Sequence, residues 1–428
     1  MAWDHLTRRF IILSCLYCSI LCLSALRSDQ DQCDSLSRTL VESSTLDIDL
    51  KMLKGEEISH VFRESAVGLS KRQDIIKMQR GPESHMHEII FRIKGRNDDT
   101  LLEILHDVSN PHSKNYGKHM TSEEITKLTS NELSHDHVIK FLKSEGVTIV
   151  SETISKEYVT ATAQLGLWEK ILNTHFNVYH HVHESSDLVN MVVRSESYSV
   201  PSQLDKHVTS VFNTIQMPFS IWSQPIIVPI DEDKGSIRAN FRSGFVNPAV
   251  LKAFYRIRND CGNSASTQAV FATIGQYYSP ADLRRFQDLH SLFPQKVAFE
   301  IGGQVSDSAC ISTPNKCAES NLDLQYLMGI SQRSPTTIWY TNLNSFANWL
   351  ITVADMPNPP KVISISYGAN EDEISQSEFE SFNSQAIRLA VMGVTIVVAS
   401  GGDMRVKFLS SVKKLISFFF LTNNGDCV

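Results

Sequence analysis

Apolar and polar positions change their spacing along this chain, and the changes separate two differently built parts. Residues 26–84 are polar and only weakly patterned, whereas residues 87–94 (HEIIFRIK) alternate as a strand does. Thr121 and Glu124 have the spacing of a capping box and predict the start of a helix. Further predicted strands lie at 147–152, 157–163, 176–182 and 190–196, and further predicted helices at 100–108, 135–145 and 165–172. We therefore expect residues 85–218 to form an α+β, ferredoxin-like unit of the split βαβ type with antiparallel pairings.

Residues 244–403 have a different hydrophobic pattern, in which short apolar runs alternate with segments of helical periodicity. The predicted strands are 269–275, 297–303, 336–341, 361–368 and 394–400, and the predicted helices are 280–293, 318–330, 345–355 and 375–392. Alternating β and α segments of these lengths imply parallel strands joined by helical crossovers. We predict an α/β domain with a doubly wound parallel sheet. Residues 219–243, rich in proline and acidic residues, predict an exposed linker and processing region.

The two ends of the chain have their own patterns. Arg8 and Arg9 precede an apolar run at 10–23, and small residues follow it, which predicts a signal peptide at 1–25; a signal anchor is the alternative. Residues 404–428 lose the alternation of strands and helices and contain three consecutive phenylalanines. This tail is interpreted as a non-homologous segment, with a membrane-surface helix as the alternative. Lysines interrupt its apolar run, so we expect no transmembrane span.

Composition narrows the class of protein only slightly. The 428 residues carry a net charge of −7 with both signs interspersed, and no basic stripe with interleaved aromatics suggests nucleic-acid binding. Of the eight cysteines, three lie in the apolar run of the signal peptide. Among the rest, Cys310 and Cys317 flank a Pro-Asn turn, and we hypothesise that they close a small loop by a disulfide.

Candidate chemistry lies in three acidic residues. Glu319 and Asp323 are four residues apart on a predicted helix, so their side chains share one face. Two carboxyl groups held together in a cleft share a proton, and such a pair can act as a general base with its orienting partner; an exposed acidic face is the alternative. Asp403 follows the last apolar strand, where a protonated Asp could donate to an oxyanion; an ordinary turn residue is the alternative. Only His290 lies after residue 207, so a Ser-His-Asp arrangement has no convincing base.

Several segments resemble the sedolisins, serine-carboxyl peptidases with a subtilisin-like fold. The segment SNPHSKNYGKHMTSEEI (109–125) resembles the family's activation domain, and VNPAVLKAFYRI (246–257) resembles the start of its mature enzyme. CAESNLDLQYLMG (317–329) carries the ExxxD motif, and VISISYGANEDE (362–373) and VTIVVASGGD (394–403) resemble strands leading to the oxyanion Asp. The resemblance covers roughly residues 85–403.

The resemblance implies roles for the candidate residues. Glu319 would be the general base toward a serine, Asp323 would hold Glu319, and Asp403 would be the oxyanion acid, although Gly401-Gly402 adds one glycine to the family's SGD and so changes the register of Asp403. The family's nucleophilic serine lies in a GTS loop, and the sequence contains no GTS. The family enzyme also binds calcium near its C-terminus, and the ligands of that site are absent here. We therefore expect a subtilisin-like sheet that is incomplete.

The same resemblance implies a zymogen of the secretory pathway, destined for a lysosome or vacuole or for secretion. Its partners would be a peptide or protein substrate and its own prodomain, which packs on the peptidase domain in cis. We hypothesise that charging of His180, His181 and His183 in acid loosens that prodomain; surface histidines without a role are the alternative. The alternatives to a peptidase are a non-catalytic, prodomain-like inhibitor of related peptidases and a membrane-associated fragment. We also expect residues 394–399 to form an unpaired apolar edge and the segment after residue 243 to fold poorly alone.

Overall fold

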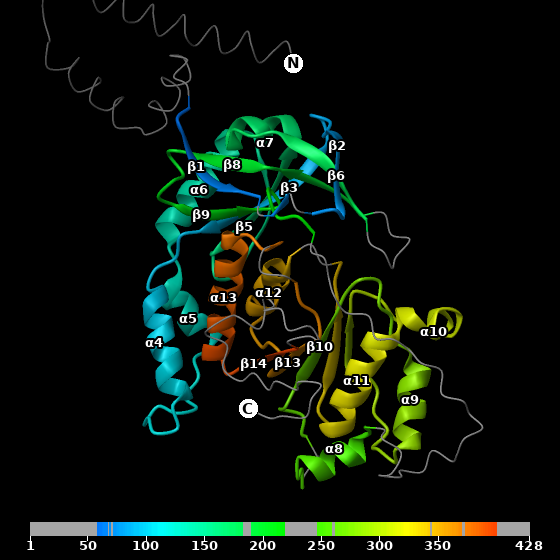
Figure 1. Cartoon of the computed structure of the whole chain (residues 1–428). Helices are drawn as coiled ribbons and strands as arrows, with labels where there is room; N and C mark the ends of the chain where they lie inside the picture. The colour runs from blue at the N-terminus through cyan, green and yellow to red at the C-terminus, as the bar shows by residue number, and fades with distance from the viewer. Residues whose placement is uncertain are drawn as a thin grey trace, which may run out of the picture. The chain divides into compact units, whose positions relative to one another are not determined.

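A computed structural model describes residues 58–66, 68–69, 72–182, 190–218, 246–258, 262–342, 345–369 and 373–399 (Figure 1). The chain divides into two units, Met1–Ser59 and His60–Val428. Almost all of the first unit, including the predicted signal peptide, lies outside the described residues. We call residues 60–218 the N-terminal α+β part and residues 246–399 the parallel-sheet part.

The N-terminal α+β part is built on a four-stranded antiparallel sheet. Its strands are β3 (Met86–Ile93), β4 (Thr148–Glu152), β5 (Tyr158–Gln164) and β9 (Val208–Phe212), in the order β4-β5-β3-β9. Since β3 and β4 both run antiparallel to β5, they point the same way with β5 between them. This is the split βαβ arrangement that the sequence predicts.

Helices α4 (Asp98–Ser109), α5 (Ser122–Thr129), α6 (Glu132–Ser144) and α7 (Leu165–Leu172) complete this part. The predicted capping box is confirmed, because the Thr121 side chain accepts from the Glu124 N–H while the Glu124 side chain accepts from the Thr121 N–H. Trp168 of α7 is fully buried against the sheet and donates its indole N–H to the His87 carbonyl oxygen. Helix packing and one buried hydrogen bond therefore close this core.

Four strands of this part were not predicted. Strands β1 (His60–Ser65) and β2 (Ile75–Arg80) lie in the segment 26–84 that the sequence left without elements, and β8 (Ser197–Pro201) and β9 follow the predicted strands β6 (Phe176–His181) and β7 (Asn190–Ser195). Strand β1 pairs with β8 across an irregularity at Phe62–Glu64, and β2 lies at the edge of the sheet β2-β6-β7 with one buried residue, Ile75. Neither strand therefore shows a regular apolar period.

The parallel-sheet part confirms the five strands predicted for it. They are β10 (Gln268–Ala272), β11 (Phe299–Ile301), β12 (Thr336–Tyr340), β13 (Val362–Ile365) and β14 (Thr395–Val398), all parallel, in the order β11-β12-β10-β13-β14. Among the described residues β14 is an edge strand, and Ile396 and Val398 are nevertheless buried. The apolar side chains of this edge are thus covered by packing on α13, even though its backbone edge has no partner strand in the described part of the chain.

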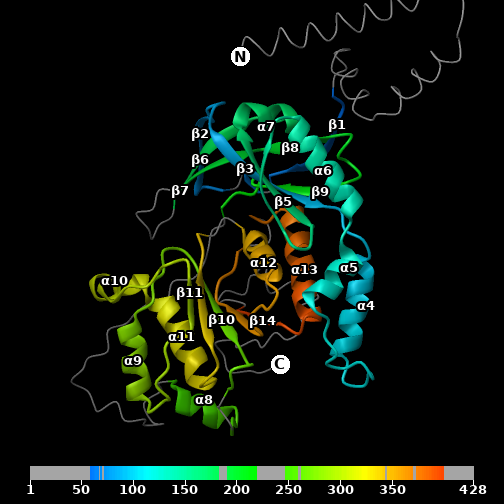
Figure 2. The same ribbon diagram turned by 180° about the vertical axis from the view of Figure 1, so that it is seen from behind.

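Helices cover both faces of this sheet (Figures 1 and 2). The helices are α8 (Pro248–Phe254), α9 (Pro280–Leu289), α10 (Asp307–Ser312), α11 (Ala318–Ile330), α12 (Phe346–Ala354) and α13 (Gln376–Val391), with the short 3-10 helix η2 (Pro314–Lys316) before α11. Phe271 of β10 packs with α12 and α13, whereas its neighbour Val270 packs on the opposite face with α9 and α11. Continuous burial of β10 follows from these two layers.

The N-terminal α+β part packs against α12 and α13 of the parallel-sheet part. The Tyr158 hydroxyl lies 2.6 Å from Ser381 Oγ, and Arg388 donates to Thr126 Oγ1 at 2.8 Å. Phe212 of β9 shares a buried apolar cluster with Ile351 of α12. The contact is therefore a packed surface with directed polar bonds.

Candidate active site

Helix α11 carries the two carboxyl groups singled out by the sequence. Glu319 lies in its first turn and is 8% exposed, and Asp323 follows one turn later on the same face. Asp323 Oδ1 accepts a 2.7 Å hydrogen bond from the hydroxyl of Ser366, the residue that follows β13. The structure therefore brings the pair to the carboxyl end of β13, next to β10.

This location has a topological reason. From β10 the chain continues to β11 and β12 on one side, and then crosses to β13 and β14 on the other. Ligand sites of open parallel sheets lie at the carboxyl ends of the strands where the connections diverge in this way. Glu319 and Asp323 lie at that place, so the interpretation as an exposed acidic face is wrong.

Burial and mutual charge control protonation at the pair. The pKa of Asp323 is raised to about 8, first by burial and then by the charge of the neighbouring Glu319 carboxyl. The Ser366 hydrogen bond lowers it and so opposes both effects. Asp323 Oδ2 is buried and has no hydrogen-bond partner among the described residues. The pKa of the Tyr367 phenol lies well above its usual range, first because of burial and then because of the Asp323 and Glu319 charges. The arrangement therefore keeps a proton on Asp323 at neutral pH.

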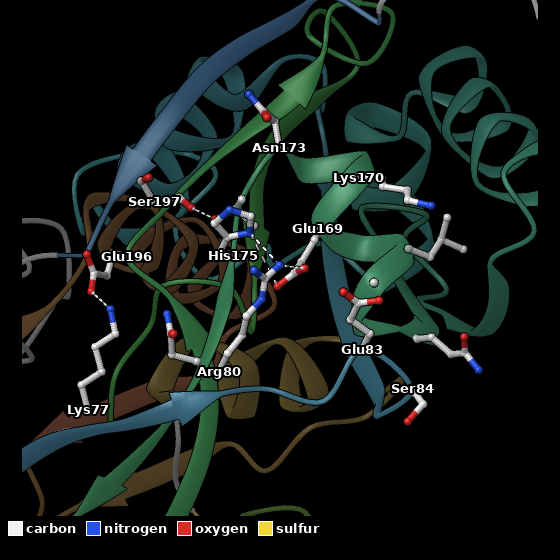
Figure 3. A pocket seen from close by; sticks show the side chains of 15 residues that line it. Lys77, Arg80, Glu83, Ser84, Glu169, Lys170, Asn173, His175, Glu196 and Ser197 are labelled. Atoms are coloured by element: carbon white, nitrogen blue, oxygen red, sulfur yellow. Dashed lines mark hydrogen bonds and ion pairs between the residues drawn. The ribbon is translucent and has the colours of Figure 1, made fainter.

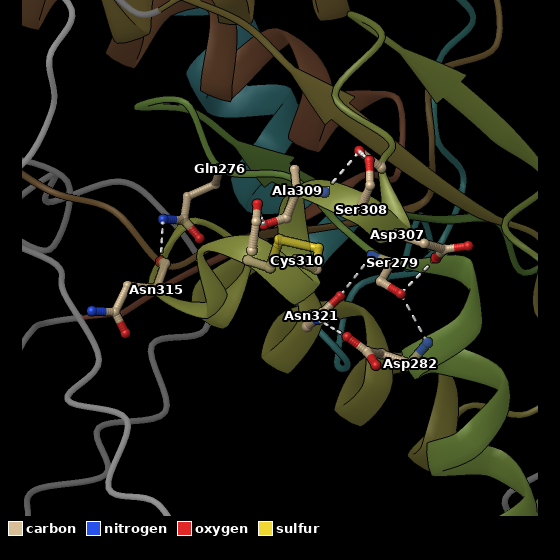
Figure 4. The surroundings of a disulfide bond; sticks show 12 residues. Gln276, Ser279, Asp282, Asp307, Ser308, Ala309, Cys310, Asn315 and Asn321 are labelled. Atoms are coloured by element: carbon tan, nitrogen blue, oxygen red, sulfur yellow. Dashed lines mark hydrogen bonds between the residues drawn. A yellow bond between two sulfur atoms is a disulfide. The ribbon is translucent and has the colours of Figure 1, made fainter.

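The first turn of α11 is tied to the loop after β10 (Figure 4). Cys310 and Cys317 form the hypothesised disulfide, with their Cα atoms 5.4 Å apart, so that hypothesis is confirmed. Gln276, in the loop after β10, accepts from the Glu319 N–H at 3.2 Å and donates to the Asn315 carbonyl oxygen at 3.1 Å. The position of Glu319 thus depends on a residue 43 positions earlier.

Two further residues of the site were missed by sequence reasoning. Ser366 could have been found from its place directly after a strand adjoining β10, because such positions face the site in parallel sheets. Gln276 gave no signal of this kind, since its role depends on a contact between two loops. Asp403 and its register lie outside the described residues, as does the tail after it.

The described residues do not fit a calcium site, because no three acidic, histidine or cysteine side chains among them are grouped to hold a metal ion. Over the same residues, no helix combines the length and apolar character needed to cross a bilayer. The calcium site implied by the family resemblance therefore has no counterpart in this part of the chain.

An open depression of about 1210 Å³ lies away from the carboxyl pair, in the N-terminal α+β part (Figure 3). Its charged side chains are largely paired with one another: Lys77 with Glu196 at 2.7 Å, and Arg80 with Glu169 at 2.5 Å. Because these charges are already satisfied and none of the lining residues belongs to the parallel-sheet part, we do not assign the catalytic chemistry to this depression.

Comparisons with known proteins identify an activation domain in the N-terminal α+β part. The model of the "Pro-kumamolisin, activation domain" family matches residues 74–217. Tripeptidyl-peptidase 1 of Mus musculus is 26% identical over 333 residues, covering 75% of this chain and 56% of that protein. Physarolisin of Physarum polycephalum is 27% identical over 369 residues, covering 80% and 59%. The chain therefore spans somewhat more than half the length of these relatives.

A solved structure of Pseudomonas sedolisin, a serine-carboxyl proteinase, aligns with a TM-score of 0.31 and 16% identity over 40% of this chain and 52% of that chain. The assignment therefore depends on the activation-domain match and on the sequence relatives, not on this alignment. The chain is therefore a homologue of tripeptidyl-peptidase 1 and physarolisin with a pro-kumamolisin activation domain, which supports its assignment to the sedolisin family.

Proposed function

We propose that this chain carries the zymogen half of an acid-active serine-type peptidase and the acid-base half of its active site. The observation that carries the proposal is the buried pair Glu319 and Asp323, in which the pKa of Asp323 is raised to about 8. A pair with divergent proton affinities divides the roles of base and orienting acid. The family membership supports serine chemistry as the reaction that this base serves.

In the proposed reaction Glu319 takes the proton of a serine hydroxyl as that oxygen attacks a peptide carbonyl. Asp323 stays protonated at acid pH, because its pKa of about 8 lies far above the working range. Its Oδ1 is occupied by Ser366, so Oδ2 is the oxygen left to carry the proton and orient Glu319. A neutral Asp323 places no second negative charge beside the Glu319 carboxylate.

Asp403 is proposed as the acid that donates to the oxyanion of the tetrahedral intermediate. The sequence contains no GTS, so we propose that this chain by itself does not complete acyl transfer. We also propose a subtilisin-like fold for the parallel-sheet part. The support for it is a parallel sheet that helices cover on both faces. The secretory route, and a lysosomal, vacuolar or secreted destination, remain proposals drawn from residues 1–25 and from the family resemblance.

A hybrid protein tests the proposal. Residues 1–403 of this chain would be continued by the remaining part of mouse tripeptidyl-peptidase 1 and assayed on peptides with free N-termini between pH 3.5 and 7.5. We expect acid-dependent hydrolysis that Glu319→Gln and Asp323→Asn remove by at least about 10²-fold each. A hybrid that unfolds cooperatively and hydrolyses peptides independently of both carboxyl groups would reject the assignment. So would acid-dependent hydrolysis by the unextended chain that is lost on mutating one of its own serines.

A second candidate function, inhibition of related peptidases by residues 26–218, is favoured by the contacts of the N-terminal α+β part with residues that flank α12 and α13. Arg72 pairs with Glu373 at 3.2 Å, and the Ile154 N–H donates to Asp355 Oδ1 at 2.7 Å. Directed bonds of this kind would allow the segment to bind a homologous peptidase in trans. An inhibition assay of residues 26–218 against a related peptidase, with Arg72→Ala as the weakened variant, tests this function.

We also propose that acid loosens the N-terminal α+β part through its histidines. Of the three histidines named from the sequence, His183 lies outside the described residues, and buried His181 places Nε2 3.2 Å from Asp74 Oδ2. An ion pair between a protonated His181 and Asp74 would stabilise the N-terminal α+β part. Its loosening in acid must therefore depend on other histidines, such as His180. Release measured against pH for the His→Gln variants at 180, 181 and 183 separates these contributions; unchanged release in all three rejects the proposal.

A further inference from the structure

The helix that carries the carboxyl pair lacks a cap of its own. Its N-cap residue, Cys317, makes no side-chain capping hydrogen bond. The other α-helices described between residues 246 and 399 each have a capping side chain, namely Asn247, Ser279, Ser306, Ser345 and Ser375. Unsatisfied N–H groups in a first turn allow a helix end to fray. Glu319 lies in that turn, so its position needs another source of order.

Gln276 supplies the missing hydrogen bond from outside the helix. Its Oε1 accepts from the Glu319 N–H, and its Nε2 donates to the carbonyl oxygen of Asn315. The N–H of the next residue, Tyr277, donates to the Lys316 carbonyl oxygen at 2.7 Å. One loop therefore contacts the helix start and the short segment before it at the same time, and Figure 4 shows Gln276 beside Asn315.

The segment that Gln276 contacts before α11 lies in a loop that the disulfide closes. Asn315 and Lys316 lie between Cys310 and Cys317, which are seven residues apart and are 6% and 1% exposed. Closing a loop restricts the conformations that it can reach. The carbonyl oxygens that receive Gln276 and Tyr277 are thereby held in place relative to the first residue of α11.

The loop after β10 is itself held in an unfavourable backbone conformation. Ile274 has φ 55° and Gly275 has φ 65°, and a β-branched residue is rarely found in the left-handed region. The Gly275 N–H donates to the Tyr340 hydroxyl at 3.0 Å, which helps to hold the turn. Strain of this kind persists only where the surroundings fix it. Here the turn directs Gln276 toward α11.

We propose that Gln276 and the Cys310–Cys317 disulfide form a clamp that fixes the first turn of α11 and so sets the position of Glu319 relative to Asp323. Gln276 acts in this clamp as a positioning residue; the catalytic importance of the clamp rests on the function proposed above. Opening the disulfide frees Asn315, Gln276 loses its second partner, and the turn that carries Glu319 frays. Asp323, which faces Glu319, Ser366 and Tyr367, then gains water and loses the charge beside it.

The pH profile of Asp323 reports on the clamp without any need for hydrolysis. The full chain would be treated with a hydrophobic carbodiimide, which modifies protonated buried carboxyl groups, and labelling at Asp323 would be followed by mass spectrometry between pH 4 and 9. We compare the untreated protein, the protein reduced by dithiothreitol, the double variant Cys310→Ala/Cys317→Ala, and Gln276→Ala. Reduction converts the disulfide to two thiols and the reagent to its cyclic disulfide, and peptide mapping verifies it at this pair.

We expect the labelling midpoint to fall by about one pH unit or more in all three altered proteins, a tenfold change in proton affinity. A midpoint unchanged by reduction and by Gln276→Ala would overturn the proposal, whether or not the cysteine variant folds. Loss of peptidase activity in a hybrid with an intact midpoint would count against the proposed function and not against the clamp.

Gln295→Ala is the matched control. Gln295 also bridges two backbone groups of the parallel-sheet part, donating to Ser334 O at 2.6 Å and accepting from the Arg333 N–H at 2.7 Å. Its loss should lower stability by a similar amount and leave the Asp323 midpoint in place. An equal shift in Gln295→Ala and Gln276→Ala would mean general loosening, and the clamp would be rejected.

Discussion

The hydroxyl of Ser366 donates a 2.7 Å hydrogen bond to Oδ1 of Asp323, and the bond connects the end of β13 to the second turn of α11. Of the three effects that set the pKa of Asp323, burial and the Glu319 charge raise it, and only the Ser366 hydrogen bond stabilises the ionised carboxylate. The bond therefore limits how far the pKa of Asp323 rises. It thereby also affects how firmly Asp323 holds the proton that it would donate to Glu319.

Removing this hydroxyl should raise the pKa of Asp323 further. A hydrogen bond to a charged group contributes about 1.5–3 kcal/mol, and one pKa unit corresponds to about 1.4 kcal/mol, so Ser366→Ala should move the Asp323 labelling midpoint up by about one unit. Ser364→Ala, within β13, removes the same chemical group and should leave the midpoint unchanged. A midpoint that stays in place or falls in Ser366→Ala would contradict the assigned hydrogen bond.

The raised pKa of Asp323 also predicts the sign of a stability change with pH. Between its ordinary pKa of 3.8 and the folded value of about 8, the folded protein holds a proton that the unfolded chain releases. The contribution is therefore fully present below the lower value and is lost as pH rises toward the higher one. Asp323→Asn should flatten this dependence, and the difference in slope should approach about 1.4 kcal/mol per pH unit.

Urea unfolding of the full chain and of Asp323→Asn between pH 4.5 and 8 measures that difference. Other described groups also titrate in this window, among them Glu378 and His87. Burial raises the pKa of Glu378 to about 7, which acts in the same direction, whereas burial lowers the pKa of His87 to about 4, which destabilises the fold as pH falls. Glu378→Gln is the control for a second buried carboxyl group. Parallel curves for the wild type and Asp323→Asn would show that Asp323 is ionised throughout.

The sequence predicted the parallel-sheet part well because its central strands, β10 and β12, are buried along their whole length, and each strand is an apolar run between helical patterns. It also brought Glu319 and Asp323 together, because an i, i+4 spacing fixes their proximity once the helix is recognised. Strands β1 and β2 could not be found this way. Their partners lie more than 90 residues away, His60 facing Pro201 and Ile75 facing His181, and their exposed faces break the period. Ser366 and Gln276 join the site only through the fold.

The contact between the two parts of the chain should depend on Tyr158. Its hydroxyl lies 2.6 Å from Ser381 Oγ and accepts from Gln385 Nε2 at 3.2 Å, both on α13. Tyr158→Phe leaves the Ser381 and Gln385 side chains without this partner and should lower the free energy of unfolding by about 1–3 kcal/mol. Hydrogen exchange should accelerate in residues 376–391, because the covering strand is held less firmly.

Tyr198→Phe is the matched variant for this experiment. Tyr198 is also a buried tyrosine, but its hydroxyl accepts from the Val211 N–H within the N-terminal α+β part. Its loss should lower stability by a similar amount and accelerate exchange around β8 and β9. Equal acceleration of α13 in the two variants would mean that Tyr158 has no particular role at the contact.

Gly393 and His119 should be coupled across the same contact. Gly393 has φ 80°, and a Cβ added there would lie 2.7 Å from His119 Cδ2. Gly393→Ala therefore combines left-handed strain of about 1–2 kcal/mol with a steric clash. In a His119→Ala background the clash is gone and only the strain remains, so we expect a coupling energy of about 1 kcal/mol in urea unfolding. Gly146, with φ 84° and no atom within 4 Å of an added Cβ, supplies the strain alone. Gly146→Ala should thus lose about as much unfolding free energy as Gly393→Ala does in the His119→Ala background. If the effects of Gly393→Ala and His119→Ala simply add, the histidine ring does not approach the glycine in solution.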